Sequence, residues 1–406
     1  MRLAPTAVIV LALAACGSSP GAPAPAGLPR FYSVPAGVSA AAPGTLLKWQ
    51  RVHIAGLEGT SYRVMYVSRD VDGRSTAVTG VVMVPPTRPP RGGFRVVSWA
   101  HGTNGMAPGC APSLDPSARL PPVSVLNAAL ALGWEVVATD YQGEGTPPDI
   151  LPYLVGDVAA YDTLDIVRAA EELPEAHAGR RYVVWGYSEG GQAALFAWRL
   201  AATADRADGL HLVGVVAGAP PSHLTDRLAA LLPGPNRVFL YQVAIGFNAA
   251  YGAERAPLVQ VLTPLGRSLA PVAHHECLSG LSAVLDRYSP QQVFVPRPLP
   301  SKTWRPLVER NDPATFSSAS GVPLLLVQGT GDAVVDPGAT AALARHLCGL
   351  GAHVEGWWYP GQNHGTTLPV STPDVARWIA AVFEGHGFTA YQPVGEPGAE
   401  KTSCAP

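Results

Sequence analysis

Residues 181–197 read Arg181-Tyr-Val-Val-Trp-Gly-Tyr-Ser-Glu-Gly-Gly-Gln-Ala-Ala-Leu-Phe-Ala197, and this stretch decides the fold. Residues 182–185 are β-branched or aromatic and carry no charge, which is typical of a buried strand. From Gln192 onward apolar residues recur at helical spacing. Between strand and helix lies Gly186-Tyr-Ser-Glu-Gly190, a Gly-x-Ser-x-Gly sequence. In this context it predicts a tight turn that lifts the hydroxyl of Ser188 above a sheet.

Context separates this motif from a second copy with the same spacing. Gly17-Ser-Ser-Pro-Gly21 also matches, because a chain with 43 glycines forms such patterns by chance. That copy lies in a Pro/Gly/Ser tract with no strand pattern before it and no helix pattern after it. Ser188 is therefore the candidate nucleophile.

The first residues have the form of a bacterial export signal. A positive start at Arg2 is followed by an apolar run that is shorter than the roughly 20 residues of a membrane span. Leu13-Ala-Ala-Cys16 has the form of a lipobox, which predicts cleavage before Cys16 and a lipid on this residue. We expect residues 1–16 to be a signal peptide and residues 17–44 a flexible tether. The lipid would hold the exported protein at a membrane face outside the cytoplasm, whereas cleavage elsewhere would release a secreted protein.

Composition indicates a globular protein that does not bind nucleic acid. Apolar residues make up 47% of the chain and charged residues 14%. The formal net charge is −2 and no basic cluster is present in the sequence.

The cysteines predict disulfides and no metal site. Without Cys16 an even number remains, which in an exported chain predicts two disulfides with three connectivities open. These cysteines are Cys110, Cys277, Cys348 and Cys404. Their wide spacing does not resemble a zinc site, and His274-His-Glu-Cys277 has no second ligand cluster to accompany it.

The order of strand and helix patterns indicates an α/β fold. Strand-like segments at 46–55, 61–69 and 76–84 predict an antiparallel edge. Alternating patterns then predict a mostly parallel sheet with helices on both faces. Expected strands are 94–99, 134–139, 182–185, 212–217, 322–328 and 353–359; expected helices are 123–132, 156–173, 338–350, 373–384 and one from 192.

A Pro-rich, mainly helical segment interrupts this alternation. We expect residues 221–319 to form a cap over the carboxyl ends of the strands, where α/β sheets bind ligands. Its expected helices are 222–232, 237–250 and 281–288. The core would then comprise residues 45–220 and 320–390, followed by a C-terminal tail at 391–406.

A serine nucleophile needs a base and an acid that orients the base. His364 lies in Gly361-Gln-Asn-His-Gly365, a turn after the last strand, and completes the chain order serine, acid, histidine. Asp332 follows the glycine turn of the preceding strand and is the favoured acid. Asp336 is the alternative, although its place before a helix indicates an N-cap.

The nucleophile also needs donors for an oxyanion, which we expect to be backbone N–H groups. One belongs to Glu189, the residue after the nucleophile. The other is expected from Thr103, with Gly102 as the alternative, in His101-Gly-Thr-Asn-Gly105 after an earlier strand. His101 is then expected to shape the loop more than to transfer protons.

Several of these stretches together resemble the α/β-hydrolase superfamily and, within it, the secretory lipase family of actinobacteria and yeasts. The resemblance covers about residues 45–385. It is carried by Ser98-Trp-Ala-His-Gly-Thr103, Cys110-Ala-Pro-Ser113, Thr139-Asp-Tyr-Gln-Gly-Glu-Gly145, Gly186-Tyr-Ser-Glu-Gly-Gly-Gln192 and Gly331-Asp332.

The resemblance implies a catalytic triad of Ser188, Asp332 and His364, an insertion that acts as a lid, and hydrolysis of carboxylic esters. It also implies disulfides between Cys110 and Cys277 and between Cys348 and Cys404. The expected function is that of a lipase or esterase, with triacylglycerol among the candidate substrates. An acyl-enzyme mechanism of this kind needs no metal or cofactor.

Two alternatives stay open at this point. An acyltransferase or a peptidase could use the same triad, and a surface-binding protein could carry a relict site. The apolar residues 238–247 suit the binding of acyl chains and equally suit the core of the cap.

Overall fold

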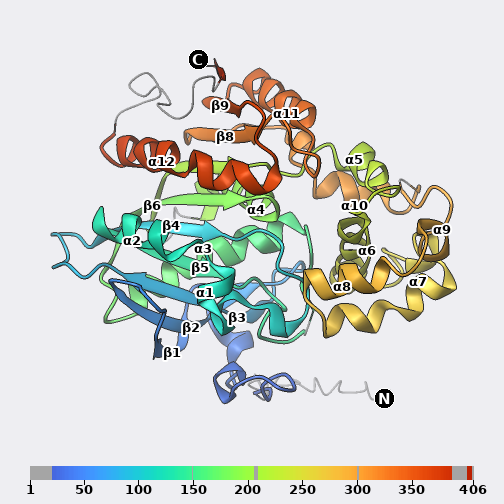
Figure 1. The fold of residues 1–406 in the computed structure, drawn as a ribbon. Coiled ribbons are helices and arrows are strands. Elements are labelled where there is room, and N and C mark those ends of the chain that lie inside the picture. Colours follow the sequence, from blue (N-terminus) through green and yellow to red (C-terminus); the bar gives the residue numbers. More distant parts are fainter. Residues whose placement is uncertain (1–20, 149, 205–208, 300, 386–399, 405–406) are drawn as a thin grey trace, which may run out of the picture.

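The computed structural model describes residues 21–148, 150–204, 209–299, 301–385 and 400–404. A ten-stranded sheet runs through the centre in the order β1-β2-β3-β5-β4-β6-β7-β8-β9-β10 (Figure 1). Its first strands, β1 (Leu46–Val52), β2 (Thr60–Arg69) and β3 (Ser75–Val84), pair antiparallel. The predicted antiparallel edge is thereby confirmed.

The middle of the sheet is parallel, as predicted, because helical crossovers return the chain to the same end of the sheet. Strands β5, β4, β6, β7, β8 and β9 are parallel neighbours in that order. Their bounds are β4 (Phe94–Ala100), β5 (Trp134–Thr139), β6 (Ala178–Tyr187), β7 (His211–Gly218), β8 (Leu324–Gly329) and β9 (Val354–Tyr359). Strand β6 begins at Ala178, four residues before the apolar run, because Ala178 already pairs with Phe94 of β4.

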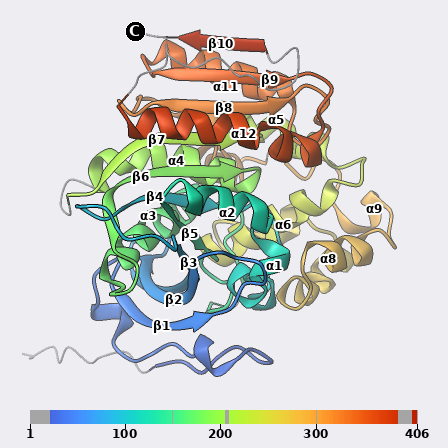
Figure 2. The same cartoon turned by 60° about the vertical axis from the view of Figure 1, so that its left-hand side comes forward.

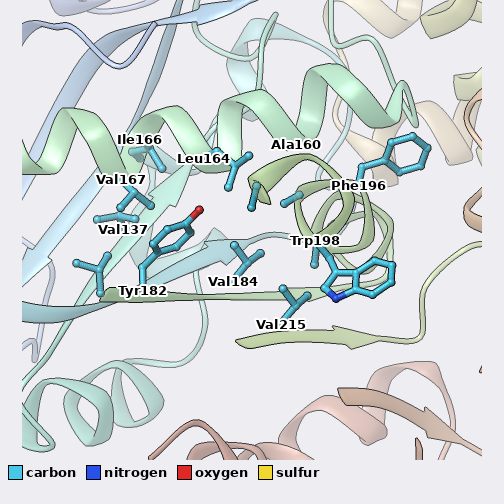
Figure 3. Packing of buried hydrophobic residues seen from close by; sticks show 14 of the residues in the cluster. Val137, Ala160, Leu164, Ile166, Val167, Tyr182, Val184, Phe196, Trp198 and Val215 are labelled. Atoms are coloured by element: carbon cyan, nitrogen blue, oxygen red, sulfur yellow. The ribbon is translucent and has the colours of Figure 1, made fainter. Parts of the chain in front are cut away.

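Helices cover both faces of the sheet. On one face α3 (Gly156–Glu172) and α4 (Glu189–Ala204) pack on side chains such as Val184 of β6 (Figure 3), and α11 (Pro337–Gly349) packs on β8 and β9. On the other face α2 (Val123–Ala131) and α12 (His364–Phe383) pack on Val183 and Trp185. Successive residues of β6 point to opposite faces and are buried on both, which explains its uninterrupted apolar run.

The segment between β7 and β8 is a helical cap, and its apolar side chains form one cluster with residues 141–159 of the core. It lies to one side of the sheet, at the right of Figure 1. Its α-helices are α5 (Leu224–Ala230), α6 (Arg237–Tyr251), α7 (Pro264–Ser268), α8 (Leu278–Leu285), α9 (Pro290–Val293) and α10 (Arg305–Arg310). Short 3₁₀ helices η6 (Leu258–Gln260), η7 (Ala270–His274) and η8 (Pro313–Thr315) connect or follow them.

The segment before β1 packs against the core, in contrast to the predicted flexible tether at 17–44. Tyr32 is fully buried, and its hydroxyl is 2.8 Å from that of Ser113. Val38 packs on Met65 and Val67 of β2. Residues 21–44, with η1 (Arg30–Tyr32) and η2 (Val38–Ala40), are thus held by these apolar contacts.

The predicted signal peptide and Cys16 lie outside the described residues. Among the described residues, no helix is both long and apolar enough to cross a bilayer.

The last described segment also differs from the prediction. Residues 391–406 were expected to be a tail, but β10 (Glu400–Cys404) pairs antiparallel with β9 at the edge of the sheet (Figure 2). A disulfide joins Cys404 to Cys348 of α11, which holds this strand at the edge.

A second disulfide joins the core to the cap. Cys110 ends η3 (Pro108–Cys110), a short helix that precedes η4 (Pro112–Leu114) and α1 (Pro116–Arg119). Its partner is Cys277, 167 residues later, at the N-cap of α8. Both pairings implied by the resemblance are therefore confirmed.

Helix α12 begins at His364, nine residues before the predicted start at Pro373. The side chain of Asn363 caps it by accepting hydrogen bonds from the backbone N–H groups of Gly365 (2.9 Å) and Thr366 (3.1 Å). Pro369 and Pro373 lie inside the helix, although proline removes a backbone donor there. The prediction took Pro373 as the first residue of the helix and therefore placed the start of α12 too late.

We predict that the two disulfides stabilise different parts of the molecule. Removing either pair, as Cys110→Ala with Cys277→Ala or Cys348→Ala with Cys404→Ala, should lower the free energy of unfolding by about 2–5 kcal/mol. Only the first double variant should accelerate hydrogen exchange in η3 and α8, because only this disulfide joins them. Urea unfolding and hydrogen exchange measure both effects. Unchanged exchange in both segments would contradict the prediction.

Candidate active site

Ser188 lies at the sharp turn between β6 and α4 that the sequence predicts. Its φ of 60° is a left-handed conformation that non-glycine residues adopt at a cost of about 1–3 kcal/mol. A side chain at Gly186 would collide with the carbonyl of Gly190, and one at Gly190 would collide with that of Ala100. Both glycines of the motif are therefore required by the close approach of the backbone.

Three of the predicted residues come together at this turn. Nε2 of His364 lies 3.0 Å from Oγ of Ser188, and Nδ1 of His364 lies 2.7 Å from Oδ2 of Asp332. Each residue follows the carboxyl end of a different parallel strand. Ser188 follows β6, Asp332 follows β8, and His364 begins the helix after β9. Chain segments far apart in sequence thus meet at one edge of the sheet.

The surroundings of Asp332 favour the ionised carboxylate. Burial would raise its pKa, but hydrogen bonds from His364 and from the backbone N–H groups of Val335 and Val334 outweigh burial and leave the pKa below its usual value. The N–H groups lie 2.9 and 2.8 Å from Oδ1. An ionised Asp332 accepts the hydrogen of Nδ1, so the lone pair of Nε2 faces the hydroxyl of Ser188.

Asp336, the alternative acid, has a different position. Its side chain caps α11 by accepting a hydrogen bond of 2.8 Å from the backbone N–H of Gly338. It also pairs with Arg227 of the cap at 2.5 Å. The structure therefore brings Asp332, and not Asp336, to His364.

The loop predicted to supply an oxyanion donor lies beside Ser188. A Cβ atom built on Gly102 would lie 3.6 Å from Cβ of Ser188. Glu189 is the first residue of α4, where backbone N–H groups have no acceptor within the helix. Within the described part of the chain, no protein acceptor is found for the N–H groups of Thr103 and Glu189. These two groups are thus available to stabilise negative charge.

His101 shapes this loop, as expected. Its Nδ1 lies 2.7 Å from the carbonyl oxygen of Gly102 and 3.3 Å from Nδ2 of Asn104. Burial lowers the pKa of its imidazole to about 4, so the ring is neutral at pH 7.

A cavity of about 300 Å³ opens next to Ser188, at the small end of the range for ligand pockets. Core and cap both line it, with Tyr153 and Val334 from the core and leucines from α5. These leucines are Leu224 and Leu228, together with Leu231 directly after α5.

These leucines were not predicted from the sequence as site residues. Their spacing of four and three residues within the predicted helix 222–232 is the stripe of one helix face, and this signal could have found them. Residues 238–247 instead contribute mainly to the core of the cap, and Phe239 alone among them lines the cavity.

Among the described residues, no group of three or more His, Cys, Asp or Glu side chains could hold a metal ion. Cys277 of the rejected motif His274-His-Glu-Cys277 is engaged in the disulfide with Cys110.

Comparison with known proteins gives a consistent family and fold. The model of the secretory lipase family matches residues 122–390. A probable inactive lipase of Mycobacterium tuberculosis is 28% identical over 89% of this chain and 83% of its own length. A secreted triacylglycerol lipase of Malassezia globosa is 24% identical over 90% of this chain and 81% of its own length.

Solved structures give the same fold. Lipase A of Candida antarctica in its closed state superposes with a TM-score of 0.78, at 20% identity, over 92% of this chain and 91% of its own. The predicted α/β-hydrolase fold is confirmed.

Proposed function

The chain belongs to the secretory lipase family and is a carboxylic ester hydrolase, and we propose that Ser188, His364 and Asp332 are its catalytic triad. The observation that carries this proposal is the unbroken contact from Asp332 through His364 to Ser188, at 2.7 and 3.0 Å. A nucleophile, a base and an orienting acid in this arrangement perform acyl transfer on several unrelated folds.

The proposed reaction has two halves. Nε2 of His364 takes the hydroxyl proton while Oγ of Ser188 attacks the ester carbonyl carbon, and the carbonyl oxygen becomes an oxyanion. The backbone N–H groups of Glu189 and Thr103 stabilise this charge. When the intermediate collapses, the ester C–O bond breaks, and the alcohol leaves with the proton held on His364.

The second half regenerates the enzyme. His364 takes a proton from water, and the water oxygen attacks the acyl carbon bound to Ser188. The carboxylic acid then leaves, and Oγ of Ser188 regains a proton from His364. Asp332 stays ionised throughout and stabilises the imidazolium that forms in each half. Every step uses side chains and backbone of this chain, with water as the co-substrate.

The lining of the cavity supports an ester with an apolar acyl group as substrate. Leucines of α5 and Phe239 of α6 face the space beside Ser188, so an acyl chain placed there would leave water. The secreted triacylglycerol lipase among the relatives supports lipid esters, including triacylglycerol, as substrates.

The relative described as a probable inactive lipase supports a different candidate, a surface-binding protein with a relict site. The complete hydrogen-bonded triad of this chain favours the hydrolase. An acyltransferase or peptidase would use the same residues and would differ only in acceptor or leaving group.

We predict that Ser188→Ala lowers kcat/KM for a chromogenic ester by at least about 10⁴-fold, because the nucleophile is removed. Asp332→Asn should lower it by about 10³–10⁴-fold, because the tautomer of His364 changes. Asp336→Asn is the matched control and should cost less than tenfold, since Asp336 caps α11 and pairs with Arg227 but makes no hydrogen bond to His364.

The same variants separate the alternatives. If wild type neither hydrolyses esters nor reacts with a serine-directed fluorophosphonate, the protein is not a serine hydrolase. Turnover of amides that is faster than turnover of esters would indicate a peptidase. Turnover of esters that requires an added acceptor alcohol would indicate an acyltransferase.

We predict that Leu228→Trp, which fills the cavity, lowers kcat/KM for an octanoyl ester at least about tenfold more than for an acetyl ester. Leu132→Trp is the control, because Leu132 is 54% exposed and does not line the cavity. Equal losses for both esters would show that the acyl chain binds elsewhere.

For localisation we propose export, followed by attachment to a membrane through a lipid on Cys16. The lipobox sequence Leu13-Ala-Ala-Cys16 and the family of secretory lipases support this proposal. Radiolabelled palmitate should enter the wild-type protein in cells but not a Cys16→Ser variant. Equal labelling of both would refute the anchor, and a soluble unlabelled wild type would indicate plain secretion.

A further inference from the structure

A pair of buried acids lies behind the loop at 101–105. Glu189 is 2% exposed, and Glu144, in the turn after β5, is fully buried. Within the described residues neither carboxyl forms an ion pair with a lysine or arginine. Both oxygens of Glu144 and Oε2 of Glu189 have no hydrogen-bond partner in that part of the chain. Two acids so close to the nucleophile thus lack the cations that normally compensate buried charge.

Burial favours the neutral form of both carboxyl groups. Burial raises the pKa of Glu189 to about 8, even though a hydrogen bond with Thr103 lowers it in part. Burial, together with Glu189, raises the pKa of Glu144 well above its usual value. Nε2 of His101 lies 3.6 Å from Glu144, and because His101 is also neutral this contact is not an ion pair.

Few other titratable groups face Glu189. They are Tyr141, in the same turn as Glu144, and Tyr153, in the segment before α3. Arg119 acts farther out, on His101 and Glu144. The charge on Glu189 therefore depends mainly on its burial and on its contact with Thr103.

The hydroxyl of Thr103 lies between Glu189 and Tyr153. It accepts from or donates to the carboxyl of Glu189, and its Oγ1 lies 2.9 Å from the hydroxyl oxygen of Tyr153. A threonine hydroxyl has only one hydrogen to donate. The protonation state of Glu189 therefore sets the direction of the chain of hydrogen bonds.

With neutral Glu189, the carboxyl donates to Thr103, and Thr103 donates to Tyr153. The hydrogen of the Tyr153 hydroxyl then remains free. With ionised Glu189, Thr103 must donate to the carboxylate, and Tyr153 must donate to Thr103. Ionisation thus withdraws the hydrogen of Tyr153.

Tyr153 lines the same cavity as Ser188 and is itself only 3% exposed. Gly246 of the cap packs directly against its backbone, where a larger side chain would collide. The backbone of Tyr153 is therefore held in place at the wall of the cavity, and its side chain is buried there.

We propose that neutral Glu189 is a positioning residue that, through Thr103, leaves the hydroxyl hydrogen of Tyr153 free to donate to the ester oxygen atoms in the transition state. This inference rests on the proposed ester hydrolysis at Ser188. Ionised Glu189 would oppose the reaction in a second way, because its charge lies beside the developing oxyanion in a medium of low dielectric constant.

The decisive measurement is the dependence of kcat/KM on pH, between pH 6 and 10, for a chromogenic ester. In wild type we expect activity at neutral pH that falls about tenfold between pH 7 and 9, as Glu189 ionises. In Glu189→Gln the amide donates to Thr103 at every pH, so this alkaline fall should disappear. Ser188→Ala supplies the rate of background hydrolysis at each pH.

Tyr153→Phe is an independent test that removes one buried oxygen atom. At pH 7 we expect kcat to fall about tenfold with KM nearly unchanged, in line with a lost donor. At pH 9 the variant and wild type should differ less than at pH 7, because the hydrogen is already withdrawn from wild type. Thermal unfolding checks that each variant is folded.

The outcomes separate this inference from the proposed function. Wild-type turnover no faster than Ser188→Ala would refute the ester hydrolase itself. Suppose instead that wild type is active. If Glu189→Gln then shows the same alkaline fall as wild type, or if Tyr153→Phe has an unchanged kcat at pH 7, only the role of Glu189 is refuted. If Glu189→Gln does not fold, the pH profile of Tyr153→Phe decides.

Discussion

The close contact between the start of α4 and the backbone of β4 is the constraint on which the site depends. Gly190 lies against the carbonyl group of Ala100, and Gly191 lies against that of Gly218 at the end of β7. The first turn of α4 is thus wedged between the ends of β4 and β7, the two strands that flank β6. This wedge forces the chain to reverse at Ser188, and it carries the loop after β4 to within contact of the nucleophile. Catalytic geometry here follows from backbone packing that no other residue type allows.

Polar contacts order the cap internally and attach it to the core. Asp312, which follows α10, accepts hydrogen bonds from the N–H groups of His223 (2.9 Å) and Leu224 (2.6 Å) at the start of α5. The amide oxygen of Asn311 accepts from the N–H of Gly156, where α3 begins. Helix α5 is therefore fixed at its N-terminus next to the core, while its side toward α11 depends on the partly exposed pair of Arg227 with Asp336. An exposed pair contributes little stability, so this side is the weaker attachment.

Sequence patterns predicted the parts of the site that local chemistry determines. The turn at Ser188, the glycine turn before Asp332 and the loop of His364 each need particular residues within a few positions, so short stretches of sequence indicate them. The burial of Tyr32 could not be predicted in this way, because it depends on Ser113, which lies 81 residues away. Strand β10 belongs to the same class, since it pairs with an edge of the sheet that only the folded chain creates. The leucines of α5 differ, because their helical spacing is visible in the sequence and only the surface that they line depends on the fold.

The surroundings of the two carboxyl groups beside Ser188 favour opposite protonation states, and the difference comes from burial and from the donors around them. Asp332 is buried, but a histidine and backbone N–H groups donate to it, so its charge is compensated. Glu189 is buried as deeply and meets the hydroxyl of Thr103, with no cation beside it among the described residues. An anion at Asp332 stabilises the imidazolium that forms during acyl transfer, whereas an anion at Glu189 would repel the oxyanion. Burial without a compensating charge is thus what makes a glutamate tolerable in the position directly after the nucleophile.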